Sequence, residues 1–322
     1  MPSLLNIQNL SIEFKTDTGT FRAVDSLSFN VNEGDRLGIV GESGSGKSAT
    51  CLSILRLLPT PPSKIISGSV FYKRWDLLQL SHALIRKVRG KHIGMIFQDP
   101  MSSLNPVFTL RMQMNETLKA HHKLSTREAD EKSIDMLKKL GIQDAETRIQ
   151  DYPHQFSGGM RQRVLIGMAL LPDPKLLIAD EPTTALDVTV QKQIVTLLQD
   201  TLASKPEMGM ILVTHNLSLV KALCRTTLVM YSGRMLEYGP TQDVLKEPLH
   251  PYTQGLKDAI PSALSRKKLY SIPGQIPSLQ DLPSGCKFHP RCPRATPQCQ
   301  KEEPPLFQKT SDRKVRCWLY HD

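Results

Sequence analysis

The chain has 322 residues, of which 39% are hydrophobic and 22% charged, and its formal net charge is +10. No apolar run reaches the roughly 18 residues that a membrane-spanning helix needs. The longest candidate is Val164 to Leu171, so the chain cannot by itself form a path across a membrane. Its excess of Lys and Arg is spread along the sequence, which argues against nucleic-acid binding and fits a protein resting at an anionic membrane leaflet.

The N-terminal part of the chain predicts a sheet, a strand and a helix in that order. Residues 3–34 alternate between apolar and polar and contain turn signals, which predicts an antiparallel edge sheet. Arg36–Val40 is typical of a short buried strand, and Ala49–Leu58, which ends before Pro59, predicts a helix. The residues between this strand and this helix fit the phosphate-binding pattern G-x-x-x-x-G-K-[ST], namely Gly41, Glu42, Ser43, Gly44, Ser45, Gly46, Lys47 and Ser48.

The residue types of this loop suit phosphate chemistry. Its glycines let the backbone curl so that successive N–H groups point at phosphate oxygens, and the N-terminus of the following helix adds a partial positive charge. Lys47 can reach the β- and γ-phosphates, and the Ser48 hydroxyl can ligate Mg²⁺. The loop therefore predicts a nucleotide site but leaves the type of nucleotide-driven protein open.

A second segment, which ends in two carboxylates, narrows the type of nucleotide-driven protein. Residues 174–178 form a short apolar run that leads into Asp180 and Glu181. In phosphate-loop enzymes an Asp at the end of such a strand lies beside Mg²⁺, and a Glu directly after it can accept a hydrogen bond from an attacking water. The distance from the phosphate loop leaves room for an inserted subdomain.

The insertion is expected to be helical, from about residue 100 to about residue 170. Ser125 and Glu128 resemble a capping box, and the residues up to Leu140 predict an exposed amphipathic helix. Within Gln155–Arg163 a Ser-Gly-Gly turn precedes a helix predicted for Arg161–Leu170. The start of that helix is a second N-terminus able to bind an anion.

The segment Phe156-Ser157-Gly158-Gly159-Met160 resembles the Leu-Ser-Gly-Gly-Gln signature of the ATP-binding-cassette (ABC) ATPases. Other motifs similar to those of the family occur in the expected order. They are the aromatic that stacks on adenine (Phe14, with Phe21 as a rival), the Q-loop glutamine (Gln98, in the segment Met95 to Pro100), the D-loop (Ala185, Leu186 and Asp187) and the switch histidine (His215).

The signature departs from the family pattern at two positions. Phe156 replaces Leu and Met160 replaces Gln, whereas the Ser and Gly residues that touch phosphate in the family are kept. We therefore expect a working site in which Met160 marks a subfamily.

The resemblance implies a fold and an activity. The fold is an α/β P-loop NTPase of the ABC cassette type over residues 1–238, with a mostly parallel core sheet, an antiparallel edge sheet and the helical subdomain. The activity is ATP hydrolysis, with Mg²⁺ at Ser48, Gln98 and Asp180. Glu181 would orient or deprotonate the water and His215 would contact the γ-phosphate, while Gln98 would couple to membrane subunits. Two cassettes would sandwich two ATP molecules, each held by one phosphate loop and by the opposite signature, Ser157, Gly158 and Gly159, beside Asp187.

Residues 239–322 are rich in Pro and weakly periodic, which predicts a loop-rich extension with little core. Four cysteines gather there in the spacing C-x5-C-x6-C-x17-C: Cys286, Cys292, Cys299 and Cys317. No signal peptide is visible, and disulfides are disfavoured in the cytosol where an ATPase works, so the cluster suggests a metal site. The spacing lacks the C-x2-C pair of zinc ribbons and suits a [4Fe–4S] cluster, with zinc or reduced structural thiols as alternatives. Cys51 and Cys224 are expected to be buried apolar residues of the cassette.

This extension narrows the resemblance further. His250–Gln254, the stretch from Gly285 to Trp318, Gln98–Pro106 and Gln155–Arg163 resemble the dipeptide/oligopeptide (peptide/nickel) importer ATPases. That family implies a heterodimer with a second, homologous ABC ATPase subunit, two transmembrane permease subunits, an extracytoplasmic peptide-binding protein and no nucleic acid. The location it implies is peripheral, at the cytoplasmic face of the bacterial inner membrane.

Other cassette functions are alternatives. A nickel or sugar importer is possible within transporters, although the cysteine-bearing tail argues against sugar. A regulatory cassette ATPase acting on ribosomes or DNA usually carries two cassettes or a long coiled-coil insertion, and the sequence shows neither.

Overall fold

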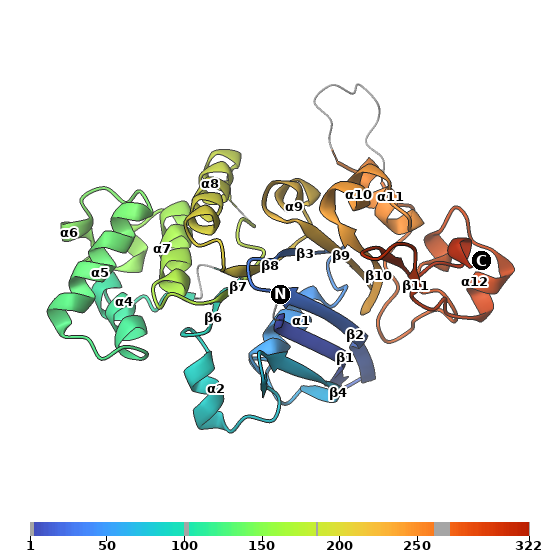
Figure 1. The fold of residues 1–322 in the computed structure, drawn as a ribbon, viewed down its shortest axis with the longest axis horizontal. Helices are drawn as coiled ribbons and strands as arrows, with labels where there is room; N and C mark the ends of the chain where they lie inside the picture. Colours follow the sequence, from blue (N-terminus) through green and yellow to red (C-terminus); the bar gives the residue numbers. More distant parts are fainter. Residues whose placement is uncertain (1–2, 100–102, 185, 261–270, 322) are drawn as a thin grey trace. The chain divides into compact units, whose positions relative to one another are not determined.

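The computed structural model describes residues 3–99, 103–184, 186–260 and 271–321 (Figure 1). The chain divides into two compact units, Met1–Gln79 with Leu212–Asp322, and Leu80–Ile211. Four residues of the predicted motifs lie outside the described residues: Pro100, Met101 and Ser102 of the importer-like segment Gln98–Pro106, and Ala185 of the D-loop.

The first unit contains the predicted antiparallel sheet. Its strands are β1 (Ser3–Thr16), β2 (Gly19–Asn32), β4 (Ser63–Tyr72) and β5 (Trp75–Asp76), in the order β2-β1-β4-β5 (Figure 1). β1 pairs antiparallel with both β2 and β4. The alternation of residues 3–34 is thus confirmed as two paired strands.

A second group of strands in this unit carries the phosphate loop. β3 (Arg36–Val40), which matches its predicted bounds, pairs in parallel with β9 (Thr226–Tyr231), and β9 pairs antiparallel with β10 (Arg234–Pro240). β8 (Gly209–Thr214) ends in this unit, just before α9 (Leu217–Leu223). The strands are buried along most of their length, so they hold the loop after β3 on a rigid base.

The helix after the loop is shorter than predicted. α1 spans Lys47–Ile54 rather than Ala49–Leu58. Arg56 takes a left-handed φ of 51°, and the Leu57 N–H returns to the carbonyl of Leu52 at 2.8 Å. This is the six-to-one bond of a Schellman motif. Arg56 takes the left-handed position that is usually a glycine, so the sequence does not signal this helix end.

The extension begins with α10 (Thr241–Lys246) and α11 (Pro251–Asp258) and continues through short elements. These are η2 (His289–Arg291), α12 (Pro297–Lys301), β11 (Phe307–Gln308), β12 (Lys314–Val315) and η3 (Trp318–Tyr320). β12 pairs antiparallel with β10, so the extension adds strands to the cassette sheet. The expectation of little core is wrong here, because Tyr252, Phe288 and Val315 are at most 1% exposed.

The second unit contains two parallel strands and most of the helices. β6 (Ile93–Ile96) pairs in parallel with β7 (Leu176–Asp180). The helices are α2 (His82–Val88), α4 (Leu110–Lys119), α5 (Thr126–Lys139), α6 (Ala145–Arg148), η1 (Pro153–Gln155), α7 (Gly158–Leu170) and α8 (Val188–Ser204).

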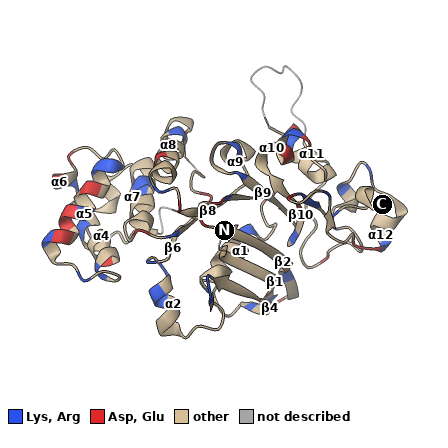
Figure 2. Ribbon diagram, viewed as in Figure 1, with Lys and Arg blue, Asp and Glu red and all other residues tan. Residues whose placement is uncertain are grey.

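The predicted helical segment has a core of its own. Residues of α4, α5 and α7, among them Leu110, Met114, Leu137 and Val164, pack into one buried cluster. The capping box at Ser125 and Glu128 is confirmed, since each side chain bonds to the backbone N–H of the other. Figure 2 shows charges of both signs along α5, and Arg127 pairs with Glu131 at 2.9 Å, so its polar face is solvated.

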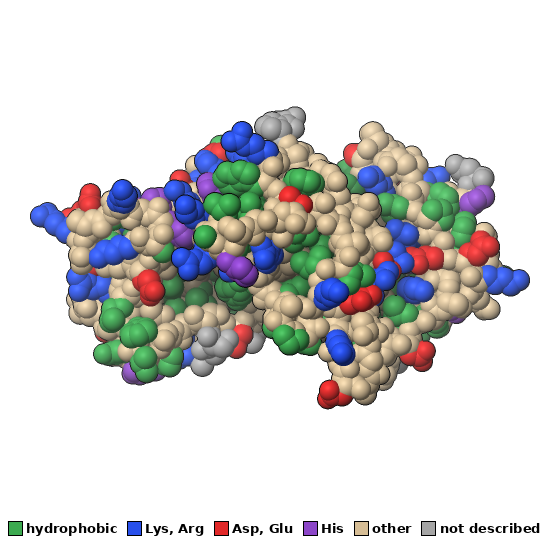
Figure 3. All heavy atoms as spheres, turned by 90° about the horizontal axis from the view of Figure 1, so that it is seen from below, with side chains coloured by type: hydrophobic (Ala, Val, Ile, Leu, Met, Phe, Trp, Pro, Cys, Tyr) green, Lys and Arg blue, Asp and Glu red, His purple; other side chains and the backbone are tan. Residues whose placement is uncertain are grey.

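Charge is also mixed on one face of the molecule. Figure 3 shows Lys and Arg interspersed with Asp, Glu and apolar side chains on the face that it presents. In the part of the chain that the structure describes, no helix combines the length and the apolar character required to cross a bilayer.

Candidate nucleotide site and four-cysteine cavity

The phosphate loop turns sharply between β3 and α1. Gly46 has a φ of 99°, and a Cβ atom there would lie 2.4 Å from the carbonyl oxygen of Ala23, so only glycine fits. Lys47 is only 5% exposed, and its ammonium donates to the carbonyl oxygens of Gly41 at 2.9 Å and Glu42 at 2.8 Å. The loop therefore holds its own cation in place, ready for an anionic ligand.

The two aromatic rings that are candidates for stacking on adenine contact each other. Phe14 of β1 and Phe21 of β2 face each other in register. Their ring centroids are 5.8 Å apart with an interplanar angle of 12°. Both are half-buried, so they form one aromatic platform instead of two separate candidates.

In the second unit, the predicted acidic pair ends β7. Asp180 is its last residue and is 4% exposed. Glu181 follows with a left-handed φ of 46°, a conformation that costs energy in a residue other than glycine and is concentrated at functional sites. Its Oε2 accepts hydrogen bonds from the Thr184 hydroxyl at 2.7 Å and from Nε2 of Gln98 at 3.5 Å. The backbone and these partners aim the carboxylate.

The helix that follows the signature serine, α7, begins at Gly158, three residues before the predicted start at Arg161. Ser157 is the N-cap, and its hydroxyl accepts from the Met160 N–H at 3.3 Å. Phe156, which departs from the family pattern, is 2% exposed in the helical core, with the Arg148 guanidinium 4.7 Å from its ring centroid. The phenylalanine in place of leucine is therefore accommodated by packing in the helical core, and Ser157 stays exposed.

The two signature glycines have different surroundings. A Cβ atom on Gly159 would lie 2.6 Å from Cγ1 of Val190 on α8, whereas a Cβ atom on Gly158 would meet nothing within 4 Å. Asp187 caps α8 by accepting from the N–H of the same Val190 at 2.9 Å. The signature and the D-loop thus meet at Val190, and Gly158 leaves an open surface.

The predicted site residues fall on both units. The first unit holds Phe14, the phosphate loop and His215, which lies between β8 and α9. The second unit brings together Gln98 and Glu181 at the end of β7, and Gly159 and Asp187 at α8.

Two supporting residues of the second unit were missed in the sequence analysis. Thr184 anchors Glu181, and its position three residues later is a local turn signal that could have found it. Gln162 of α7 is 2% exposed and donates to the carbonyl of Pro182 at 2.7 Å. This hydrogen bond connects the signature helix to the segment after Glu181. No local sequence pattern predicts it.

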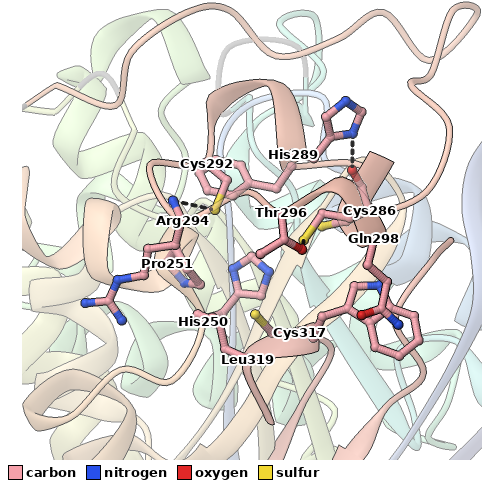
Figure 4. A pocket seen from close by; sticks show the side chains of 13 residues that line it. His250, Pro251, Cys286, His289, Cys292, Arg294, Thr296, Gln298, Cys317 and Leu319 are labelled. Carbon is pink, nitrogen blue, oxygen red and sulfur yellow. Dashed lines mark hydrogen bonds between the residues drawn. The ribbon is translucent and has the colours of Figure 1, made fainter. Parts of the chain in front are cut away.

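The four extension cysteines line one cavity of about 110 Å³, shown in Figure 4. All four are free thiols. Burial raises the pKa of Cys286 to about 12 and that of Cys317 to about 11. His250 also lines the cavity, and its buried Nε2 has no hydrogen-bond partner among the described residues. In the described part of the chain, no three His, Cys, Asp or Glu side chains are placed to hold one metal ion.

The fold and the phosphate loop define a P-loop NTPase of the ABC cassette type. A solved dimeric ATP-binding cassette in a post-hydrolysis state, bound to ADP and Pi, is similar with a TM-score of 0.66 and 26% identity, over 74% of this chain and 98% of that chain. A subunit of an ABC transporter complex of Clostridium perfringens is similar with a TM-score of 0.64 and 27% identity, over 77% and 92%. The expected fold class is thereby confirmed.

Sequence comparisons place the chain within that class. The ABC transporter family model matches residues 24–184, and the model for the oligopeptide/dipeptide transporter C-terminal region matches residues 236–299. A putative peptide import ATP-binding protein of Brucella abortus (strain 2308) is 48% identical over 315 residues, 98% of this chain and 94% of that protein. The dipeptide transport ATP-binding protein DppD of Escherichia coli (strain K12) is 44% identical over 316 residues, 98% and 96%.

This chain belongs to the ABC transporter family of ATP-binding proteins. It is therefore an ATPase that uses ATP with Mg²⁺.

Proposed function

We propose that this chain is the ATP-hydrolysing subunit of an ABC importer for dipeptides or oligopeptides. The observation that carries this proposal is the joint match of the cassette and the extension. The relatives named for peptide import and dipeptide transport are similar over 98% of this chain, including the region that matches the oligopeptide/dipeptide transporter model.

The ATP-site roles are assigned by chemistry. Lys47 binds the β- and γ-phosphates, and the Ser48 hydroxyl and the Asp180 carboxylate hold Mg²⁺, with Gln98 as a further oxygen ligand. These oxygen donors are the type that Mg²⁺ prefers, and the bound ion neutralises charge on the phosphates. The Glu181 carboxylate orients or deprotonates the attacking water. His215 contacts the γ-phosphate.

The remaining site residues serve adenine and the opposite nucleotide. The Phe14–Phe21 platform stacks on the adenine ring. Ser157 and Gly158 face the nucleotide of a second cassette, for which the exposed helix N-terminus and the open surface at Gly158 are suited. Asp187 supports that surface through α8.

We assign the cassette to residues 1–238 and the extension to residues 239–322. The partners are a second, similar ABC ATPase in a heterodimer, two membrane permeases and an extracytoplasmic peptide-binding protein. The chain itself then works peripherally at the cytoplasmic face of the bacterial inner membrane.

The four-cysteine cavity is proposed to hold a [4Fe–4S] cluster. Four thiols on one cavity match the ligand set of such a cluster. The buried, unpartnered Nε2 of His250 offers a hydrogen bond toward the same cavity. When bound, the cluster would serve to fix the extension.

Reconstitution tests the transport proposal. The chain is co-expressed with the permease, ATPase and binding-protein genes found beside its own, purified from membranes and placed in proteoliposomes. ATP hydrolysis is expected to rise when a dipeptide or oligopeptide is added with the binding protein, and not with nickel ions or a sugar. Stimulation by nickel or a sugar alone would overturn the peptide assignment.

Subunit analysis of the same complex tests the heterodimer. Four different chains besides the binding protein are expected. A stable, active complex with two copies of this ATPase would contradict the heteromeric part and leave peptide import standing.

A further inference from the structure

The second residue of the phosphate loop is held by an arginine from the extension. The Glu42 carboxylate accepts from Nη1 of Arg291 at 2.8 Å and from Nη2 at 3.1 Å. Arg291 lies in the η2 turn, and its side chain is only 5% exposed. The contact is therefore a two-pronged, largely desolvated ion pair, the geometry in which an arginine is most specific.

All three polar groups of Glu42 are engaged. Its backbone N–H donates to the hydroxyl of Tyr252, a buried residue of α11, at 2.8 Å. Its carbonyl accepts from the Lys47 ammonium at 2.8 Å. Glu42 thus connects two extension residues directly to the lysine that faces the phosphates.

The arginine itself is held rigidly. Its Nε donates to the carbonyl of Pro273 at 2.9 Å, and Nη1 also reaches the Tyr231 hydroxyl at 3.4 Å. Beside it, the rings of Tyr231, Tyr252 and Phe288 meet at centroid distances of 4.8 to 5.3 Å. An arginine held by this many contacts is rigid enough to fix the position of the Glu42 side chain.

The charge of Glu42 explains why its ion pair with Arg291 matters for nucleotide binding. A carboxylate within a phosphate-binding loop has the same sign as the nucleotide and would repel it. Arg291 cancels that charge at short range while it fixes the shape of the loop.

We propose that Arg291 and Tyr252 are positioning residues for ATP, through which the extension sets the affinity of the phosphate loop. The inference rests on the proposed nucleotide role of that loop. Because coupling between two sites is reciprocal, bound ATP in turn stabilises the docked extension.

The test compares five variants of the full chain in its complex. ATP binding is measured by calorimetry with a non-hydrolysable analogue, KM and kcat by steady-state hydrolysis, and unfolding by thermal melts. Arg291→Met should weaken binding about tenfold and raise KM more than it lowers kcat, because it leaves the Glu42 charge uncancelled. The double variant Glu42→Gln/Arg291→Met should recover part of the affinity, and Arg291→Lys, which keeps the charge without the fork, should lie between wild type and Arg291→Met.

The matched control is Arg313→Met. Arg313 is another extension arginine, 11% exposed, and its guanidinium bonds to Glu237 of β10 at 2.9 Å and to the Glu247 carbonyl at 2.8 Å, neither of which is a loop residue. This variant should lower the melting temperature with little change in ATP affinity. The proposal is overturned if Arg291→Met melts earlier but binds the analogue as wild type does, or if Arg313→Met weakens binding equally.

Lys47→Ala separates this inference from the function on which it rests. If Lys47→Ala loses analogue binding and Arg291→Met does not, only the proposed positioning role of Arg291 is refuted, and the nucleotide site stands. Unchanged binding in both variants would contradict the nucleotide site itself.

Discussion

Thr184 donates its hydroxyl hydrogen to Oε2 of Glu181 across 2.7 Å. The same oxygen is within 3.5 Å of Nε2 of Gln98, and the backbone of Glu181 is held at a left-handed φ of 46°. The carboxylate proposed to act on water is thus oriented by its own unit before any ligand arrives. Preorganisation of this kind is a major source of catalytic power.

Glu181→Gln is expected to abolish turnover while ATP binding persists. The amide keeps the size of the side chain and an oxygen for the Thr184 hydrogen bond, but it cannot take up a proton or hold a water as a carboxylate does. The variant should trap the ATP-loaded, closed dimer, visible by size-exclusion chromatography with ATP. Steady-state hydrolysis near the wild-type rate would remove Glu181 from the catalytic role.

Thr184→Val should lower kcat by about tenfold with little change in KM. A hydrogen bond to a charged group contributes about 1.5–3 kcal/mol, and each factor of ten in rate corresponds to about 1.4 kcal/mol. Thr184→Ser keeps the hydroxyl and should restore most of the rate. Equal losses in the Val and Ser variants would show that the threonine acts through packing and not through the hydrogen bond.

Gly159→Ala should destabilise the protein by about 1–3 kcal/mol, the usual range for overpacking. The added methyl would lie 2.6 Å from Cγ1 of Val190, so α7 and α8 must separate. Val190→Ala should relieve part of this loss in the double variant, as measured by denaturant unfolding.

Gly158→Ala is the matched control for that experiment. A methyl group there meets nothing within 4 Å, so unfolding should be nearly unchanged while hydrolysis falls, because the methyl group intrudes on the surface offered to the opposite nucleotide. An unfolding midpoint lowered as much as in Gly159→Ala would contradict the assigned packing.

Cys317→Ser should lower iron occupancy in protein purified without oxygen. The wild-type chain is expected to be brown and to hold about four irons, as four-cysteine ligation implies. The serine variant should also expose the extension to proteolysis, since the bound group would no longer fix it. Cys51→Ser, a change on α1 outside the cavity, should leave the iron content unchanged. Stoichiometric zinc in place of iron would replace the cluster with a zinc site, and no metal at all would favour plain thiols.

Local signals predicted much of the cassette. The apolar run Arg36–Val40 matched β3, and the capping box at Ser125 matched the start of α5, because both depend on neighbouring residues alone. The end of α1 was misplaced because a non-glycine residue, Arg56, takes the left-handed turn. Sequence patterns do not reveal that choice, since most side chains disfavour it.

The extension was the least predictable part. Its proline-rich sequence suggests loops without a core, yet Phe288 and Tyr252 pack against Tyr231 of β9. Strand β12 was missed because two residues carry no periodicity, and its partner, β10, lies far earlier in the chain. Contacts of this kind are decided by tertiary packing and leave no local trace.

The separation of 249 positions between Glu42 and Arg291 has a consequence for biosynthesis. The phosphate loop leaves the ribosome first, whereas its arginine emerges only after the intervening residues, since chains are made from the N-terminus. A nascent or prematurely terminated chain therefore carries the loop with an uncancelled carboxylate. Full nucleotide affinity would be reached only once Arg291 and the extension around it have been made, so copies truncated before Arg291 would compete poorly for ATP and for incorporation into the assembled transporter.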